Sequence, residues 1–133
     1  MKVSKIIATT MLMAFASFQV QAGALQDILS NGVLKAGTTG DWNPMTMKDA
    51  ATNSYTGYDI DVMTALAADM GVELEIVPTE GKTLVAGVTA GKYHMTGSAS
   101  ISPSRAKAAG YSISYFSLAT VPLTLKSNAG KYK

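Results

Sequence analysis

A serine-rich run that ends in an arginine is the first feature of this sequence suited to binding a ligand. Residues 98–105 read Ser-Ala-Ser-Ile-Ser-Pro-Ser-Arg. Ser102 followed by Pro103 predicts a helix start with Ser102 as N-cap, which puts Arg105 in the first turn. The helix macrodipole disfavours a cation there, while the free backbone N–H groups suit an anion. A carboxylate that Arg105 binds through two parallel hydrogen bonds would offset the unfavourable placement of the cation. The alternative is an ordinary solvated arginine beside a capped helix.

A second candidate is the loop Gly37-Thr38-Thr39-Gly40-Asp41-Trp42-Asn43-Pro44, which carries the only tryptophan. The indole of Trp42 could cover an apolar or aromatic ligand, and Asp41 could pair with an ammonium group. The alternative is that Trp42 packs in the core and Asp41 only stabilises a turn.

Composition excludes several kinds of site. The 133 residues include no cysteine and one histidine, so thiolate zinc sites, disulfides, thiol nucleophiles and most histidine-based catalysis are excluded. The net charge of +2 is too small to indicate nucleic-acid binding. We therefore predict no catalytic residue, no metal site and no cofactor in this chain, and no nucleic-acid partner.

Three motifs resemble catalytic or phosphate sites but lack a residue or a geometry that such a site requires. Residues 81–83 end like a phosphate-binding loop, but Ile76 stands where its first glycine should be. Asp59 and Asp61 are two positions apart on a predicted helix and point in different directions, so a paired acid and base is not expected. His94 has no partner for a catalytic triad and is expected to be structural.

The elements that must position these residues alternate along the chain. Apolar spacing and glycine or proline stops predict four helices, three strands, a hairpin or surface loop and an apolar extended segment. The helices are 24–31, 59–70, 83–90 and 102–110, the strands are 33–37, 72–77 and 93–97, the hairpin or loop is 48–56, and the extended segment is 116–125. This order predicts an α/β fold with a mainly parallel sheet. Ligands bind beyond the carboxyl ends of such strands, which selects the loops 38–44 and 98–105.

The first 22 residues have the pattern of a secretory signal peptide. Lys2 and Lys5 precede an apolar run, residues 6–18, that is shorter than the roughly 20 residues of a membrane span. Val20-Gln21-Ala22 matches a cleavage site, so residues 23–133 are the expected mature domain. They should be periplasmic, with no stable membrane insertion after signal removal.

The sequence also resembles a known family. Gly57-Tyr58-Asp59-Ile60-Asp61-Val62, followed by Leu66-Ala67 and Met70, is similar to the recognition pattern of the family 3 periplasmic solute-binding proteins. The runs 100–105 and 111–115 resemble further landmarks of that family in the same order. The resemblance covers about residues 24–126, and it implies one lobe of a two-lobed, type II periplasmic-binding-protein fold, apparently truncated at the hinge.

The resemblance carries expectations about the site. Family members bind polar amino acids or related carboxylates for an ABC importer, whose membrane component would be a partner. By position, Arg105 would bind the carboxylate, Ser100 would add a hydroxyl, Ser98 would contribute backbone groups and Trp42 would pack on the ligand. Thr39 occupies the position where many members have an acidic residue, and His94 replaces a common aspartate.

One branch of the family resembles the chain more closely. Residues 37–44, Val77-Pro78-Thr79 and Pro122-Leu123-Thr124-Leu125 are similar to cyclohexadienyl dehydratases, which are exported carbon–oxygen lyases that act on prephenate or arogenate. Their critical proton donor is a carboxylic acid of the second lobe. We therefore expect a solute-binding lobe that recognises a small carboxylate or amino acid. The alternatives are a cyclohexadienyl dehydratase, or its N-terminal half, and a lobe that is inert alone.

Overall fold

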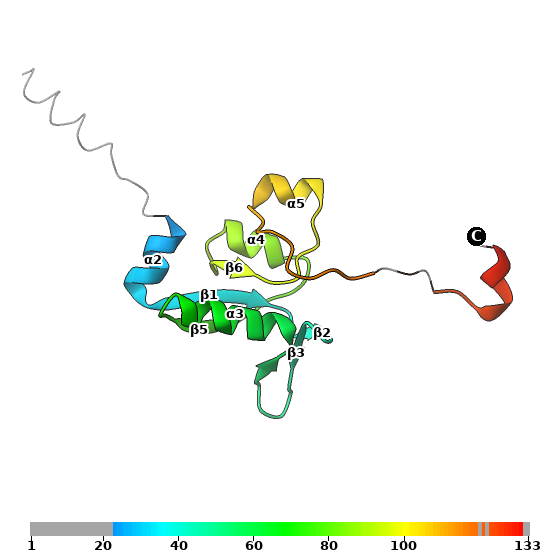
Figure 1. Ribbon diagram of the computed structural model, residues 1–133, viewed down its shortest axis with the longest axis horizontal. Helices are drawn as coiled ribbons and strands as arrows, with labels where there is room; N and C mark the ends of the chain where they lie inside the picture. Colours follow the sequence, from blue (N-terminus) through cyan, green and yellow to red (C-terminus); the bar gives the residue numbers. More distant parts are fainter. Residues whose placement is uncertain (1–22, 120, 122, 132–133) are drawn as a thin grey trace, which may run out of the picture.

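A parallel sheet of three strands forms the centre of the fold (Figure 1). Strand β1 (Val33–Thr38) lies between β5 (Glu73–Pro78) and β6 (Met95–Thr96). Val33 of β1 is paired with Glu73 of β5, and the register continues to the pair of Thr38 and Pro78. The predicted parallel α/β architecture is confirmed.

The computed structural model describes residues 23–119, 121 and 123–131. The predicted signal peptide, residues 1–22, lies outside the described residues. Within the part of the chain that is described, no helix combines the length and apolar character needed to cross a membrane.

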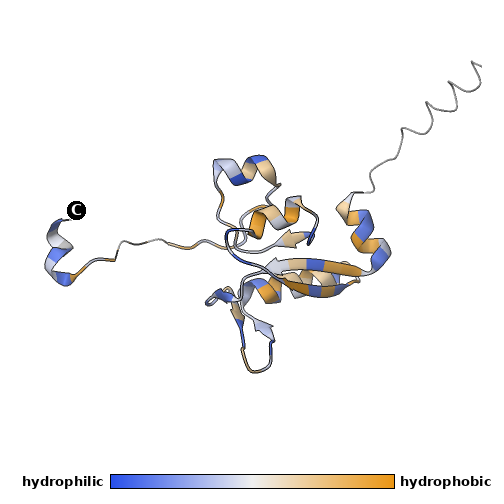
Figure 2. Cartoon of the chain, turned by 180° about the vertical axis from the view of Figure 1, so that it is seen from behind, coloured by the Kyte–Doolittle hydropathy of each residue, from blue (hydrophilic) through white to orange (hydrophobic). Residues whose placement is uncertain are grey.

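Helices α2 (Ala24–Asn31) and α3 (Tyr58–Asp69) pack on one face of the sheet. Helix α2 ends at Gly32, whose φ of 70° is left-handed, as the predicted glycine stop requires. The buried apolar residues of α3 recur at three- and four-residue steps, so the amphipathic pattern correctly predicted the face that packs in the core. The core of this face consists of Ile28, Leu34, Ala36, Ile60, Met63 and Ala67. Figure 2 shows the apolar residues gathered where the helices meet the strands.

The other face of the sheet is covered by α4 (Leu84–Thr89), with α5 (Pro103–Ala108) beside it. Successive side chains of a strand point to opposite faces, so Gly37 faces away from the core position Ala36. The ring of Tyr93, only 2% exposed, fills this side against Gly37 and Gly87.

A second, antiparallel sheet projects below the first in Figure 1. Its strands are β2 (Asp41–Trp42), β3 (Thr46–Lys48) and β4 (Tyr55–Thr56), in that order. Strands β3 and β4 form the predicted hairpin. Asp49 shapes its turn by accepting hydrogen bonds from the backbone N–H groups of Ala51 and Thr52, at 2.7 and 3.3 Å, and these bonds lower the pKa of Asp49.

Several boundaries differ from the prediction. Strand β6 has two residues instead of the five predicted over 93–97. The predicted loop 38–44 contains the short strand β2. The described residues 109–119 belong to no helix or strand, and a 3-10 helix (Lys126–Lys131, η1) ends the described chain in a region predicted only to be polar.

Candidate functional site

A cavity of about 280 Å³ opens beyond the carboxyl ends of β1 and β6. All six residues singled out from the sequence line it: Thr39, Asp41, Trp42, Ser98, Ser100 and Arg105. The remaining lining residues are Thr38, Thr46, Gly81, Leu84 and Gly97. We call this cavity the polar pocket. The two loops that the parallel-sheet rule selected therefore meet around one space.

Arg105 is turned toward residues 97–101, which we call the binding loop after the role predicted for it. Ser102 is the N-cap of α5, as predicted, and its Oγ accepts a hydrogen bond from the backbone N–H of Arg105 at 3.3 Å. The guanidinium Nη1 donates to the backbone carbonyl of Ser100 at 3.2 Å. Arg105 is partly buried, and its contact with the Ser100 carbonyl is exposed to solvent. Its role in binding a carboxylate stays a prediction.

Trp42 is held at the mouth of the pocket by the second sheet. Gly40, with a φ of 71°, turns the chain between β1 and β2, and a Cβ atom there would lie 2.8 Å from Tyr55 and Lys48. Trp42 then pairs with Thr46 of β3. The indole is 41% exposed, so the alternative of a core tryptophan is wrong.

The floor of the pocket contains a hydroxyl pair that sequence reasoning missed. The Oγ1 atoms of Thr38 and Thr46 are hydrogen-bonded at 2.6 Å, and both residues are only 4% exposed. Thr38 ends β1 and Thr46 begins β3, so this bond ties the two sheets together directly below the pocket. No local sequence pattern joins these two threonines, because their contact depends on how the sheets meet.

Charge in the pocket is balanced. Among the described residues that line it, Asp41 and Arg105 are the charged ones, and hydroxyl and backbone groups supply the other polar contacts. An arginine can bind a carboxylate through two parallel hydrogen bonds, and an aspartate can accept from an ammonium group. The pocket thus offers complementary groups to both charges of an amino acid.

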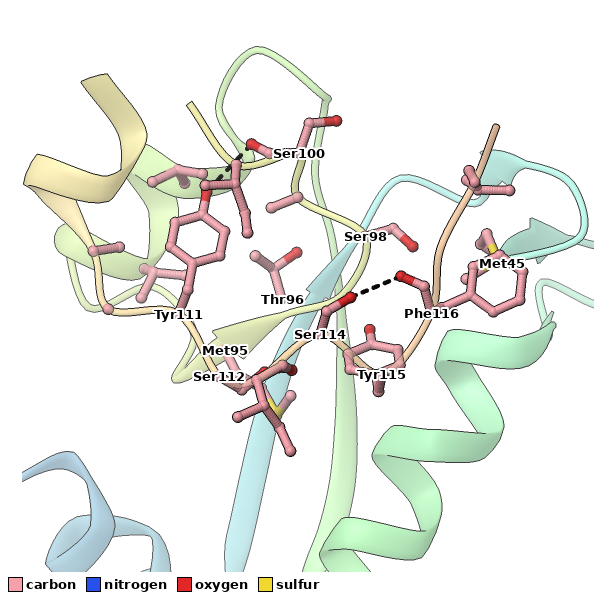
Figure 3. Close-up of a pocket in the computed structure, with 18 of the residues that line it drawn as sticks. Met45, Met95, Thr96, Ser98, Ser100, Tyr111, Ser112, Ser114, Tyr115 and Phe116 are labelled. Carbon is pink, nitrogen blue, oxygen red and sulfur yellow. Dashed lines mark hydrogen bonds between the residues drawn. The ribbon is translucent and has the colours of Figure 1, made fainter. Parts of the chain in front are cut away.

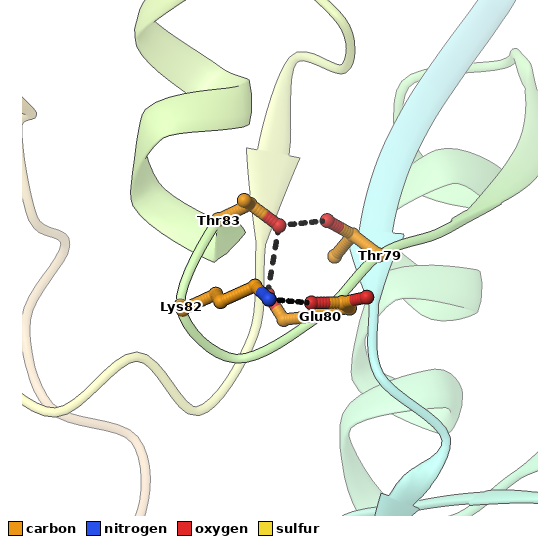
Figure 4. Close-up of polar contacts among 4 residues, drawn as sticks. All are labelled: Thr79, Glu80, Lys82 and Thr83. Carbon is orange, nitrogen blue, oxygen red and sulfur yellow. Dashed lines mark hydrogen bonds and ion pairs between the residues drawn. The ribbon is translucent and has the colours of Figure 1, made fainter.

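The stretch that ends like a phosphate-binding loop forms one wall instead. Thr79 and Thr83 are joined through their Oγ1 atoms at 3.0 Å, Thr83 also donates to the carbonyl of Glu80 at 3.1 Å, and Lys82 pairs with Glu80 at 2.8 Å (Figure 4). Lys82 and Glu80 are largely exposed. These groups bond one another, and the turn they form brings Gly81 to the pocket edge.

A larger, more apolar cavity of about 400 Å³ adjoins the polar pocket and shares Trp42, Ser98 and Ser100 with it. Its other walls come from α4, β6 and residues 109–118, which we call the return segment (Figure 3). Tyr111 of this segment donates to the carbonyl of Ser100 at 3.4 Å, so the same carbonyl receives Arg105 and Tyr111.

His94 has the structural role expected for it. Its backbone N–H donates to the carbonyl of Lys35 at 2.9 Å, and its ring Nδ1 accepts from the N–H of Lys35 at 3.0 Å. The histidine side chain therefore extends the pairing of β1 one residue beyond β6. It lines the apolar cavity and not the polar pocket.

The chain matches a known family of proteins. The model of the bacterial extracellular solute-binding proteins, family 3, matches residues 34–131. The cyclohexadienyl dehydratase of Pseudomonas aeruginosa is 33% identical over 128 residues, which cover 96% of this chain and 47% of that protein. The L-cystine-binding protein of Bacillus subtilis is 29% identical over 101 residues, which cover 76% of this chain and 38% of that protein.

A solved structure supports the fold assignment. The structure of an ancestral cyclohexadienyl dehydratase aligns with a TM-score of 0.68 at 38% identity, over 86% of this chain and 48% of that one. The chain therefore spans about half the length of the relatives it matches, and it has the predicted lobe fold of the type II periplasmic binding proteins. By its family match and its fold, the chain belongs to the bacterial extracellular solute-binding proteins of family 3.

Proposed function

We propose that this chain is the ligand-binding lobe of an exported solute-binding protein that takes up a small carboxylate, in particular an amino acid, for an ABC-type importer. The observation that carries the proposal is the meeting of Arg105, Asp41 and Trp42 around one cavity beyond the sheet. In this role Arg105 binds the carboxylate, Asp41 pairs with the ammonium group and Trp42 covers the side chain. Ser98, Ser100 and Thr39 complete the polar shell.

The names of relatives support this substrate class. They include the L-cystine-binding protein of Bacillus subtilis and a probable amino-acid ABC transporter-binding protein of Haemophilus influenzae. The leader of residues 1–22, cleaved after Ala22, would deliver the lobe to the periplasm. There the membrane component of an importer would be its partner.

The test is calorimetric titration of the purified chain with L-arginine, L-cystine and prephenate. Arg105→Ala should weaken binding of the preferred probe about 10- to 100-fold, because a charge-assisted hydrogen-bonding pair is lost. Lys107→Ala is the matched control, since Lys107 is an exposed cation on the same helix that does not line the polar pocket. Equal affinity of the wild type and Arg105→Ala would refute the proposed carboxylate site.

A second candidate function is that of a cyclohexadienyl dehydratase, or of its N-terminal half. It is favoured by the match to the Pseudomonas enzyme, which extends over 96% of this chain. The same titration distinguishes the candidates when it is combined with an assay for phenylpyruvate release from prephenate. Because the proton donor of such enzymes lies in the second lobe, binding of prephenate, with or without turnover, would support the enzyme or its N-terminal half. Binding of an amino acid without binding of prephenate would support solute binding.

A further inference from the structure

The proposed function assigns no role to Asp59, an acid that is buried. Asp59, at the start of α3, is 1% exposed, although an aspartate at a helix N-terminus is ordinarily in solvent. A buried carboxylate is costly unless it accepts hydrogen bonds. Its Oδ1 accepts one from the hydroxyl of Tyr115 at 2.9 Å, across 56 residues of sequence. Asp59 lines neither cavity.

The neighbour of Asp59 strengthens the attachment of Tyr115. The ring of Tyr58 stacks on that of Tyr115 with centroids 6.2 Å apart, and it lies 5.2 Å from the ring of Phe116. The first two residues of α3 therefore hold two consecutive residues of the return segment. Figure 3 shows Tyr115 and Phe116 lying between α3 and the loop that carries Ser98.

The binding loop packs against the same carboxylate. A Cβ atom on Gly97 would lie 2.7 Å from both Cγ and Oδ2 of Asp59, so the backbone of Gly97 touches the carboxylate directly. Ser98, the next residue, has a φ of 49°, a left-handed conformation that non-glycine residues adopt only when their surroundings hold them there. Ser98 lines both cavities.

The pKa of Tyr115 reflects its contact with Asp59. Partial burial, the hydrogen bond to Asp59 and the charge of Asp59 raise the pKa of Tyr115 to about 12, while the backbone N–H of Ser98 acts in the opposite direction. Helix α3, the return segment and the loop at Gly97 are distant in the sequence, and they meet at the carboxylate of Asp59.

We propose that Asp59 is a positioning residue for the polar pocket: together with Tyr115, it holds Gly97 and Ser98 in the left-handed turn that presents Ser98 to the ligand. The inference rests on the proposed function only in assigning a ligand to that pocket. Asp59 acts through the loop and does not touch the ligand. A carboxylate that only anchored the return segment would affect stability and leave the loop unchanged.

The test compares Tyr115→Phe and Asp59→Asn with the wild type by hydrogen–deuterium exchange over residues 97–101. Tyr115→Phe keeps the ring stack but removes the hydroxyl, so exchange in this loop should rise about tenfold. Asp59→Asn keeps an acceptor oxygen, so its exchange rate over residues 97–101 should lie between those of the wild type and Tyr115→Phe. The matched control is Tyr58→Phe, which removes a hydroxyl from the adjoining ring and leaves the Asp59 hydrogen bond in place.

Titration with L-arginine, L-cystine and prephenate then measures the effect on the pocket. For whichever probe the wild type binds, affinity should fall about tenfold in Tyr115→Phe and remain unchanged in Tyr58→Phe. If the wild type binds none of the three, the proposed function fails for these ligands, whereas the exchange data still decide the positioning role. Unchanged exchange over residues 97–101 in Tyr115→Phe, with a lowered melting temperature alone, would overturn the inference.

Discussion

At the scale of single residues, Tyr93 determines how closely α4 approaches the sheet. Its ring lies against Gly37 of β1 and Gly87 of α4, two positions where no side chain could fit. Its hydroxyl donates to the carbonyl of Leu84 at 2.7 Å. Because Leu84 lines the polar pocket, the same buried tyrosine that packs the core also places one wall of the candidate site.

Gly37→Ala should therefore destabilise the protein. The new Cβ atom would lie 2.5 Å from the Tyr93 ring, which is buried and cannot move aside without disturbing α4. Overpacking of this kind costs about 1–3 kcal/mol, measurable as a lower midpoint in urea unfolding. Gly110→Ala is the control, because a Cβ atom there meets nothing within 4 Å. Equal midpoints for the two variants would contradict this account of the core.

The residues around the polar pocket could be predicted because each of the two loops follows a strand that the sequence assigns to a parallel sheet. Their roles in binding stay predictions. The sequence places Asp59 in the family pattern and shows no catalytic partner for it, but local spacing gives no sign that a distant tyrosine donates a hydrogen bond to it. The same limit applies to Thr38 and Thr46, whose hydroxyls meet only after two sheets have assembled.

At the scale of elements, local signals predicted the helices better than the short strands. Helix ends carry chemical markers, such as Gly32 after α2 and Ser102 before α5, and these act within a few residues. Strands β2 and β6 have two residues each, and they exist because β3 and β1 pair with them. Such pairing is tertiary, so the sequence predicted β6 with the wrong length and did not predict β2.

Helix α5 provides a prediction at this scale. It has six residues, none of them buried, so its N-cap contributes much of its stability. Ser102→Ala removes the acceptor for the N–H of Arg105 and should cost about 1 kcal/mol, seen as faster hydrogen exchange over residues 103–108. Lys107→Ala changes an exposed side chain of the same helix that does not contact the cap, so its hydrogen exchange should be almost that of the wild type. Equal exchange in both variants would show that Ser102 does not cap α5.

At the scale of the whole molecule, the return segment is joined to the lobe at few points. Ile113 is 90% exposed and Leu118 is 51% exposed, so much of the apolar surface of this segment faces solvent. The contacts of Tyr115 with Asp59 and of Phe116 with Tyr58 therefore carry much of its attachment. Stability of this attachment should then depend on the protonation state of one phenol.

That dependence gives a prediction for alkaline pH. The pKa of Tyr115 is about 12 in the folded protein, and an unfolded tyrosine has a value near 10.0. Below the unfolded value both states keep the proton, so the stabilisation is fully present. As the pH rises from the unfolded toward the folded value, the unfolded chain loses the proton first, so the free energy of unfolding falls.

Urea unfolding of the wild type and Tyr115→Phe, from about pH 8 to about pH 11, checks this prediction. The other ionisable groups are present in both proteins, so their effects largely cancel in the difference between the two midpoints. That difference should narrow as the pH rises, because only the wild type carries a phenol that must lose its proton at position 115. Burial of the phenol would still raise the pKa of Tyr115 in Asp59→Asn, but this variant lacks the negative charge that adds to the shift, so its stability should fall less steeply over the same range than that of the wild type. A difference between wild type and Tyr115→Phe that stays constant across this range would mean that the hydroxyl does not sense Asp59, and the junction of α3, the binding loop and the return segment would then depend on ring packing alone.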